Sequence, residues 1–115
     1  MKEFKGTPGP WEVEDNGYFY DINAARGTVG NVCSSAIWFD NDEHRGPVAM
    51  ANAQLIAAAP KMLQALQTIQ QKMSSFITLA NDIGINDDDG FYLYAAMEAE
   101  RMARDVISEA LGEIQ

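Results

Sequence analysis

The most constraining feature of this sequence is a sharp change in composition near residue 47. Residues 1–47 hold six of the nine glycines and three of the four prolines. Residues 48–115 are rich in Ala, Leu, Met, Gln and Glu, which favour helices. Strand signals followed by helix signals are typical of the α+β class. We therefore expect one domain, residues 1–115, with a small N-terminal antiparallel sheet followed by two or three C-terminal α-helices.

Short apolar and aromatic runs predict three or four strands in the first part, at residues 11–14, 18–22, 28–33 and 36–39. Two turn signals separate the first three of these runs. Asp15-Asn16-Gly17 predicts a hairpin, because Asn-Gly readily takes the positive φ that a tight turn requires. Arg26-Gly27 predicts a second turn.

Three helices are expected in the second part, over residues 47–59, 60–80 and 91–111. Pro60 separates the first two helices because it has no N–H to donate, and Gly112 marks the end of the third. The second helix has one predicted apolar face, Met62, Leu66, Ile69, Met73, Phe76, Ile77 and Ala80. The predicted buried stripe of the third helix is Ala95, Ala99, Met102, Ala103, Val106 and Ala110.

The charge and the cysteine content exclude several classes of protein. A net charge of −9 argues against binding to a nucleic-acid polymer, which depends on Lys and Arg, and against docking on an anionic membrane. The longest nearly apolar run, residues 53–59, is too short to cross a bilayer. Cys33 is the only cysteine, so no internal disulfide forms, and a lone thiol fits a reducing compartment. We expect a cytoplasmic protein.

No residue set points to catalysis or to a metal site. The sequence has one histidine, His44, and one cysteine, whereas a structural zinc ion needs four ligands. Asp87-Asp88-Asp89-Gly90 does not fit a calcium loop, because Ile85 and Ala96 fall at ligand positions. A phosphate-binding glycine loop is also missing. The sequence therefore predicts no enzyme, no catalytic residues, no metal and no cofactor.

One stretch of the acidic sequence stands out, because no Asp or Glu occurs between His44 and Asn81. Arg45 and Lys61 lie within it near predicted helix starts, where backbone N–H groups favour an anion. The candidate ligand-binding residues are Arg26, Trp38, Arg45, Asn52, Gln54 and Lys61. The alternative is that this stretch is simply the hydrophobic centre of the domain and that Trp38 belongs to the core.

Two segments resemble a family of small phage and prophage proteins. They are the TPGPW start at residues 7–11 and the ANAQLIAAAP helix at residues 51–60, and the sequence departs from the family at Lys61. In the second segment Leu55, Ile56 and Ala59 are expected to form the packing face. The resemblance implies an accessory phage protein and carries no active site. By architecture only, the chain also resembles phage anti-Thoeris sponges, which sequester cyclic ADP-ribose-type signals.

These observations lead to two functional hypotheses for a non-enzymatic accessory protein of a phage. The first is counter-defence, by binding and sequestering a small anionic nucleotide-derived signal in the host cytoplasm. The alternative is a protein-interaction module that inhibits a host defence or regulatory protein. In either case the Ala-rich and Met-rich helix faces exceed what one small sheet covers, so we expect a homo-oligomer formed through the helices.

Overall fold

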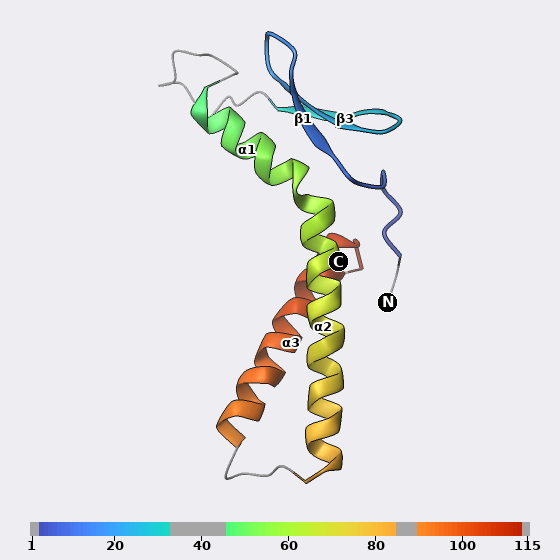
Figure 1. Cartoon of the computed structure of the whole chain (residues 1–115), viewed down its shortest axis with the longest axis vertical. Helices are drawn as coiled ribbons and strands as arrows, with labels where there is room; N and C mark the ends of the chain where they lie inside the picture. Colours follow the sequence, from blue (N-terminus) through green and yellow to red (C-terminus); the bar gives the residue numbers. More distant parts are fainter. Residues whose placement is uncertain (1–2, 33–45, 85–89, 114–115) are drawn as a thin grey trace. The chain divides into compact units, whose positions relative to one another are not determined.

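A computed structural model describes residues 3–32, 46–84 and 90–113 of the chain. In this part of the chain three β-strands are followed by three α-helices (Figure 1), which confirms the predicted α+β class. The strand expected at residues 36–39 lies outside the described residues. The chain divides into two compact units. We call Gly6–Met62 the sheet unit, and Leu63–Gln115 with Met1–Lys5 the hairpin unit.

The sheet is an antiparallel meander in the order β1-β2-β3, formed by β1 (Glu12–Asp15), β2 (Tyr20–Ala24) and β3 (Gly27–Val32). Successive side chains of a strand point to opposite faces, and β2 follows this rule closely. Tyr20 and Ile22 are buried, whereas Asn23 is on the other face, where its amide donates a hydrogen bond to Glu14 and its carbonyl accepts one from Thr28. One face of the sheet is therefore apolar and the other is polar.

Both predicted turns are present. The loop between β1 and β2 closes through a hydrogen bond from the Asn16 N–H to the Phe19 carbonyl, 3.1 Å. The Asn16 side-chain oxygen accepts bonds from the N–H groups of Tyr18 and Phe19, both 2.9 Å, and Gly17 takes a φ of 96°. The second turn ends at Gly27, whose φ is 139°. Asn and Gly thus stand where their local preferences require them.

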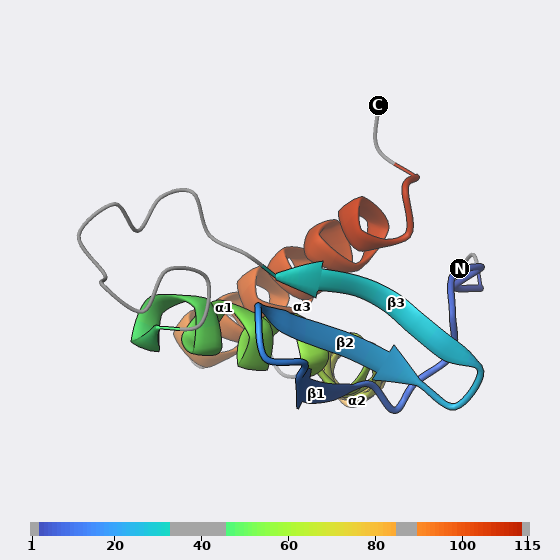
Figure 2. The same ribbon diagram turned by 90° about the horizontal axis from the view of Figure 1, so that it is seen from above.

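The first helix, α1 (Pro47–Ala57), packs on the apolar face of the sheet (Figure 2). Ala49 and Ala53 are fully buried and join the core of Tyr20, Ile22 and Val32. Their short side chains lie on the same side of the helix, one turn apart, and let the helix backbone come close to the strands. The sheet unit therefore includes α1, and its boundary at Met62 differs from the change in composition near residue 47.

The N-terminal segment is anchored to the sheet unit by two contacts. The indole N–H of Trp11 donates a hydrogen bond to the Thr7 carbonyl, 3.1 Å, and Trp11 packs beside the core. Gly9 lies so close to Pro60 that a Cβ atom at position 9 would stand 2.7 Å from the Pro60 Cβ. The TPGPW segment and the end of the ANAQLIAAAP segment therefore touch each other.

The hairpin unit is formed by α2 (Ala59–Asp82), from Leu63 onward, and α3 (Gly90–Ala110). Ala80, Ala96, Ala103 and Ile107 are its buried side chains among the described residues. Between the helices the Gln70 amide donates a hydrogen bond of 3.0 Å to the Glu100 carboxylate. This bond sets Gln70 and Glu100 at the same level along the two antiparallel helices.

Two glycines end these helices. Gly112 has a φ of 74° and its N–H bonds to the Glu109 carbonyl, while the Glu113 N–H reaches the Ser108 carbonyl. This is the Schellman arrangement, which satisfies carbonyls at a helix end. Gly84, with a φ of 78°, ends α2 with an equivalent bond to Asn81. The predicted stop at Gly112 is confirmed.

Both predicted helix faces are only partly correct. On α2, Leu66, Met73, Ile77 and Ala80 are at least half-buried, but Met62, Ile69 and Phe76 are about half exposed (47%, 50% and 48%). On α3 the buried positions include Ala96 and Ile107, whereas four of the predicted ones are exposed, namely Ala95, Met102, Val106 and Ala110. Each helix has a wider apolar surface than one neighbouring helix covers.

We expect Gly9→Ala to destabilise the sheet unit by about 1–3 kcal/mol, because the new methyl group overlaps Pro60. Gly30→Ala is the matched control, since a Cβ at position 30 meets nothing within 4 Å. Urea denaturation checks the difference. Gly9→Ala should cost less in a Pro60→Gly background, because glycine at position 60 lacks the Cβ atom that the new methyl group would meet. Equal effects of Gly9→Ala and Gly30→Ala would show that the contact is unimportant.

Ala53→Leu should cost about 1–3 kcal/mol of unfolding free energy, because three extra carbon atoms have no space between α1 and the sheet. Ala51→Leu, on the exposed side of the same helix, should change stability by less than about 0.5 kcal/mol. Thermal unfolding of both variants provides the measurement. A tolerated Ala53→Leu would contradict close packing of α1 on the strands.

Candidate functional site

The six predicted ligand-binding residues do not form one site in the described structure. Trp38 and Arg45 lie outside the described residues. Arg26 is exposed in the turn between β2 and β3, and Lys61 is exposed in the first turn of α2. Asn52 and Gln54 are exposed on α1. A role for these residues in ligand binding stays a prediction.

Helix geometry separates Asn52 from Gln54. Residues two positions apart on an α-helix are rotated by about 200° and do not face each other. The two amides therefore flank α1 on opposite sides, and apolar side chains occupy the surface between them. One small ligand does not reach both amides at once.

The start of α2 offers few free donors to an anion beside Lys61. Pro60 has no N–H, and the N–H of Met62 donates a 2.9 Å hydrogen bond to the Ala58 carbonyl. The N–H of Ala58 in turn bonds to the Gln54 carbonyl, 3.0 Å. α1 and α2 follow each other almost without interruption. Some of the backbone N–H groups that a free helix N-terminus would offer to a ligand are therefore already hydrogen-bonded within the chain.

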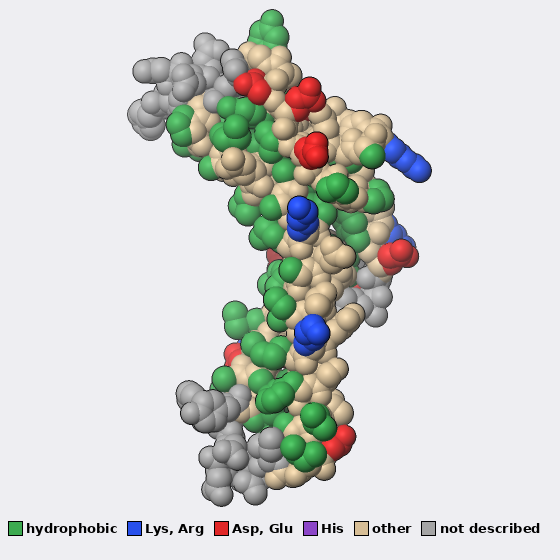
Figure 3. Space-filling view, viewed as in Figure 1, with side chains coloured by type: hydrophobic (Ala, Val, Ile, Leu, Met, Phe, Trp, Pro, Cys, Tyr) green, Lys and Arg blue, Asp and Glu red, His purple; other side chains and the backbone are tan. Residues whose placement is uncertain are grey.

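The structure instead gathers apolar side chains on the outer face of α1. We define this face as Val48, Ala51 and Leu55, which lie opposite the buried Ala49 and Ala53; the two larger side chains, Val48 and Leu55, are 46% and 61% exposed. Hydrophobic side chains reach the surface along α1 and α2 in the space-filling view (Figure 3). Apart from Asn52 and Gln54, every residue of α1 is apolar. A helix that is apolar all round is normally covered on both sides.

The packing face expected at Leu55, Ile56 and Ala59 is exposed in the single chain. The small side chains of Ala49 and Ala53 face the sheet instead. Close approach to the strands requires small residues at these two positions, whereas Leu55 lies on the opposite side of the helix. The signal in the sequence was the shortage of polar residues in α1, which indicates two covered faces.

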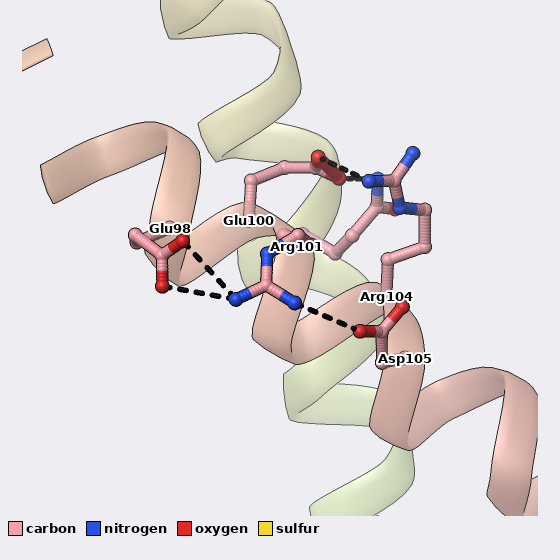
Figure 4. Close-up of polar contacts among 6 residues, drawn as sticks. Glu98, Glu100, Arg101, Arg104 and Asp105 are labelled. Carbon is pink, nitrogen blue, oxygen red and sulfur yellow. Dashed lines mark hydrogen bonds and ion pairs between the residues drawn. The ribbon is translucent and has the colours of Figure 1, made fainter. Parts of the chain in front are cut away.

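The hairpin unit has a charged side, where Arg101 and Arg104 contact carboxylates (Figure 4). A shallow hollow lies beside these residues. Arg101 pairs with Glu98 at 3.0 Å and with Asp105 at 3.4 Å, and Arg104 pairs with Glu100 at 3.6 Å. The hydrogen bond that Arg101 donates to the Glu98 carboxylate raises the pKa of Arg101. The hollow measures about 260 Å³ and is lined by Ile77, Tyr94, Met97, Glu98, Glu100, Arg101 and Arg104.

These ion pairs are suited to keeping one side of the hairpin hydrated. Both guanidinium groups already bind carboxylates and are about half exposed, and such pairs contribute little to stability. In the part of the chain that the structure describes, no three His, Cys, Asp or Glu side chains are grouped to hold a metal ion. No described helix is long and apolar enough to cross a membrane.

Comparison with known proteins gives one match. The family model described as Salmonella phage P22 protein Y8K6 matches residues 1–114. No curated protein and no solved structure matches the chain. The match spans nearly the whole sequence, including both segments that carry the resemblance to small phage proteins. The chain therefore belongs to the phage protein family of Salmonella phage P22 protein Y8K6.

Proposed function

We propose that this phage protein is a non-enzymatic accessory protein that binds and inhibits a protein of the bacterial host through the outer face of α1. The observation that supports the proposal is that α1 is apolar on both sides, while the sheet covers only one. Contiguous exposed apolar surface marks interaction sites on soluble proteins. The proposal places the protein in the cytoplasm of the infected cell, where such a partner is available.

The residues on this face suit an anchor for a protein partner. Val48 and Leu55 each keep roughly half of their surface in water. Complete burial of such a side chain stabilises by about 1.5–3 kcal/mol relative to full exposure. Leu55 is the more exposed of the two and has Ala51 one turn before it, which leaves room for a partner side chain. We infer that Leu55 is the centre of the contact.

The residues of α1 indicate the chemistry of the partner. α1 itself has no charged residue. The carboxylates of Glu12, Glu14 and Asp21 lie on the polar face of the sheet, which is the face that α1 does not cover. The complementary surface on the host protein is therefore apolar.

A small anionic nucleotide is the second candidate partner. The observation in its favour is the long stretch without acids, in which Lys61 and Lys72 are the charged residues of α1 and α2 before Asp82. Against it stand the separation of Asn52 from Gln54 and the occupied donors at the start of α2. The protein partner is therefore the function that the geometry supports better.

Affinity capture from host lysate with the wild-type chain, Leu55→Glu and Val29→Glu tests the proposal. Val29 is the matched control, because it is an exposed apolar residue of the same unit on β3. We expect the wild type and Val29→Glu to retain the same stoichiometric host protein, and Leu55→Glu to bind the purified partner at least about tenfold more weakly. Circular dichroism verifies that α1 stays helical in each variant.

Two results would contradict the proposal. Equal binding of the purified partner by Leu55→Glu would remove α1 from the contact. Calorimetric binding of a cyclic dinucleotide or a cyclic ADP-ribose product, with no host protein retained, would favour the nucleotide sponge instead.

A further inference from the structure

The hairpin unit has a second apolar surface, which is separate from α1 and composed of two stripes. Each stripe repeats at alternating steps of four and three residues, the spacing at which helices pack lengthwise against other helices. The α2 stripe is Ala65, Ile69, Lys72, Phe76, Leu79 and Ile83, all exposed. The α3 stripe is Ala95, Ala99, Met102 and Val106, all exposed except Ala99, which is half-buried.

The two stripes lie on the same side of the hairpin. Each residue of an α-helix advances by about 100°, so the α2 stripe is rotated by about a quarter turn from Leu66, Met73 and Ala80, which are turned inward. The α3 stripe is rotated by a similar angle, in the same sense, from Ala96 and Ala103. In two antiparallel helices that face each other, equal rotations of the same sense point to the same side.

The opposite side of the hairpin holds most of its charged and polar side chains, beside the exposed Tyr94 and Met97. It carries the ion pairs of Arg101 and Arg104 on α3 (Figure 4), together with glutamine and serine residues of α2 such as Gln67, Gln71 and Ser74. The hairpin is therefore amphipathic as a whole, although its two helices already cover each other along one line. A helix pair with one free apolar side is half of a four-helix bundle.

We propose that two copies of this chain pack their apolar sides together into a four-helix bundle, with the twofold axis parallel to the helices and α2 beside the partner's α3. In this arrangement every neighbouring pair of helices is antiparallel. A twofold axis along the helices leaves each residue at its own height. Residues that lie at the same height within one hairpin, such as the hydrogen-bonded Gln70 and Glu100, therefore also lie at the same height in the two copies.

This register matches side-chain sizes across the interface. Because Gln70 and Glu100 share a level, Phe76 lies within one residue, about 1.5 Å, of the level of the partner's Ala95, and Ala65 lies within one residue of the level of the partner's Val106. Ile69 is offset by the same single residue from the partner's Met102. A large residue meets a small one in two layers and a flexible methionine fills the third, as close packing requires.

The charges also favour a second copy as the occupant. Lys72 is the cation within the α2 stripe, and the same register places it level with the partner's Glu98, on the outer edge of α3. Glu98 is held in place by its bond to Arg101, 3.0 Å. Two copies with a charge of −9 each repel, and this interface opposes the repulsion by pairing a cation of one copy with a carboxylate of the other.

Sedimentation of the full chain and of two variants tests the interface. We expect the wild type to be a dimer at micromolar concentration, and Ile69→Glu to dissociate at least about a hundredfold more readily because two carboxylates enter the apolar seam. Gln71→Glu, on the polar side of the same helix, should sediment as the wild type. Met102→Glu should reproduce the effect of Ile69→Glu from the other helix. A monomeric wild type, or a monomeric Gln71→Glu, would overturn the proposal.

A charge exchange tests the register. Lys72→Glu should weaken dimerisation about tenfold, because an exposed ion pair becomes a like-charge pair twice in each dimer. Adding Glu98→Lys should restore dimerisation, whereas adding Asp105→Lys, which removes the other carboxylate bound to Arg101, should not. Equal behaviour of the two double variants would refute the pairing of α2 with the partner's α3.

The dimer and the capture of a host protein are tested by different residues. Loss of dimerisation in Ile69→Glu with retained capture would leave the α1 proposal standing. We expect the converse for Leu55→Glu, which should still dimerise but no longer capture the host protein.

Discussion

The contact of α1 with the three-stranded sheet through alanine side chains is the constraint on which the sheet unit depends. Ala49 and Ala53 let the helix backbone approach Tyr20 and Ile22 so closely that both alanines are fully buried. Val48 and Leu55, on the opposite side of the helix, stand on the outer face. The exposed Leu55 is thus a direct consequence of how the helix is held.

This contact also explains why the two familiar segments of the sequence belong together. The TPGPW segment supplies Trp11 to the border of the core and Gly9 to the surface of Pro60. The ANAQLIAAAP segment supplies the alanines that meet the sheet and the proline that meets Gly9. Membership of the family of Salmonella phage P22 protein Y8K6 therefore has a structural basis in one packed unit.

The hairpin unit is organised differently, because each of its helices has three distinct surfaces. One line of each helix covers the other helix, one side carries ion pairs, and the remaining side is apolar and exposed. Mixed pairs such as Arg101 with Glu98 keep the polar side hydrated without a large net charge. In the proposed dimer, this apolar side contacts a second hairpin of the same kind.

Local sequence signals predicted much of the fold. The Asn16-Gly17 and Arg26-Gly27 turns, the break near Pro60 and the stop at Gly112 depend on backbone preferences of single residues, and all four are found. The direction of the helix faces was predicted less well. Periodicity marks every apolar position, but it does not say which neighbour covers it, so Met102 and Val106 were expected inside a single chain in which they are exposed.

The candidate site was the least predictable part, for the same reason. Asn52 and Gln54 are close in sequence, yet helix geometry turns them to opposite sides, and Lys61 stands at a helix start whose donors are partly used. The sequence by itself determined the order of strands and helices, the turns and the family, because these depend on neighbouring residues. Only the tertiary structure decided that Ala49 and Ala53 face the sheet and that Leu55 faces outward, because the distance between a helix and a sheet selects side chains by size.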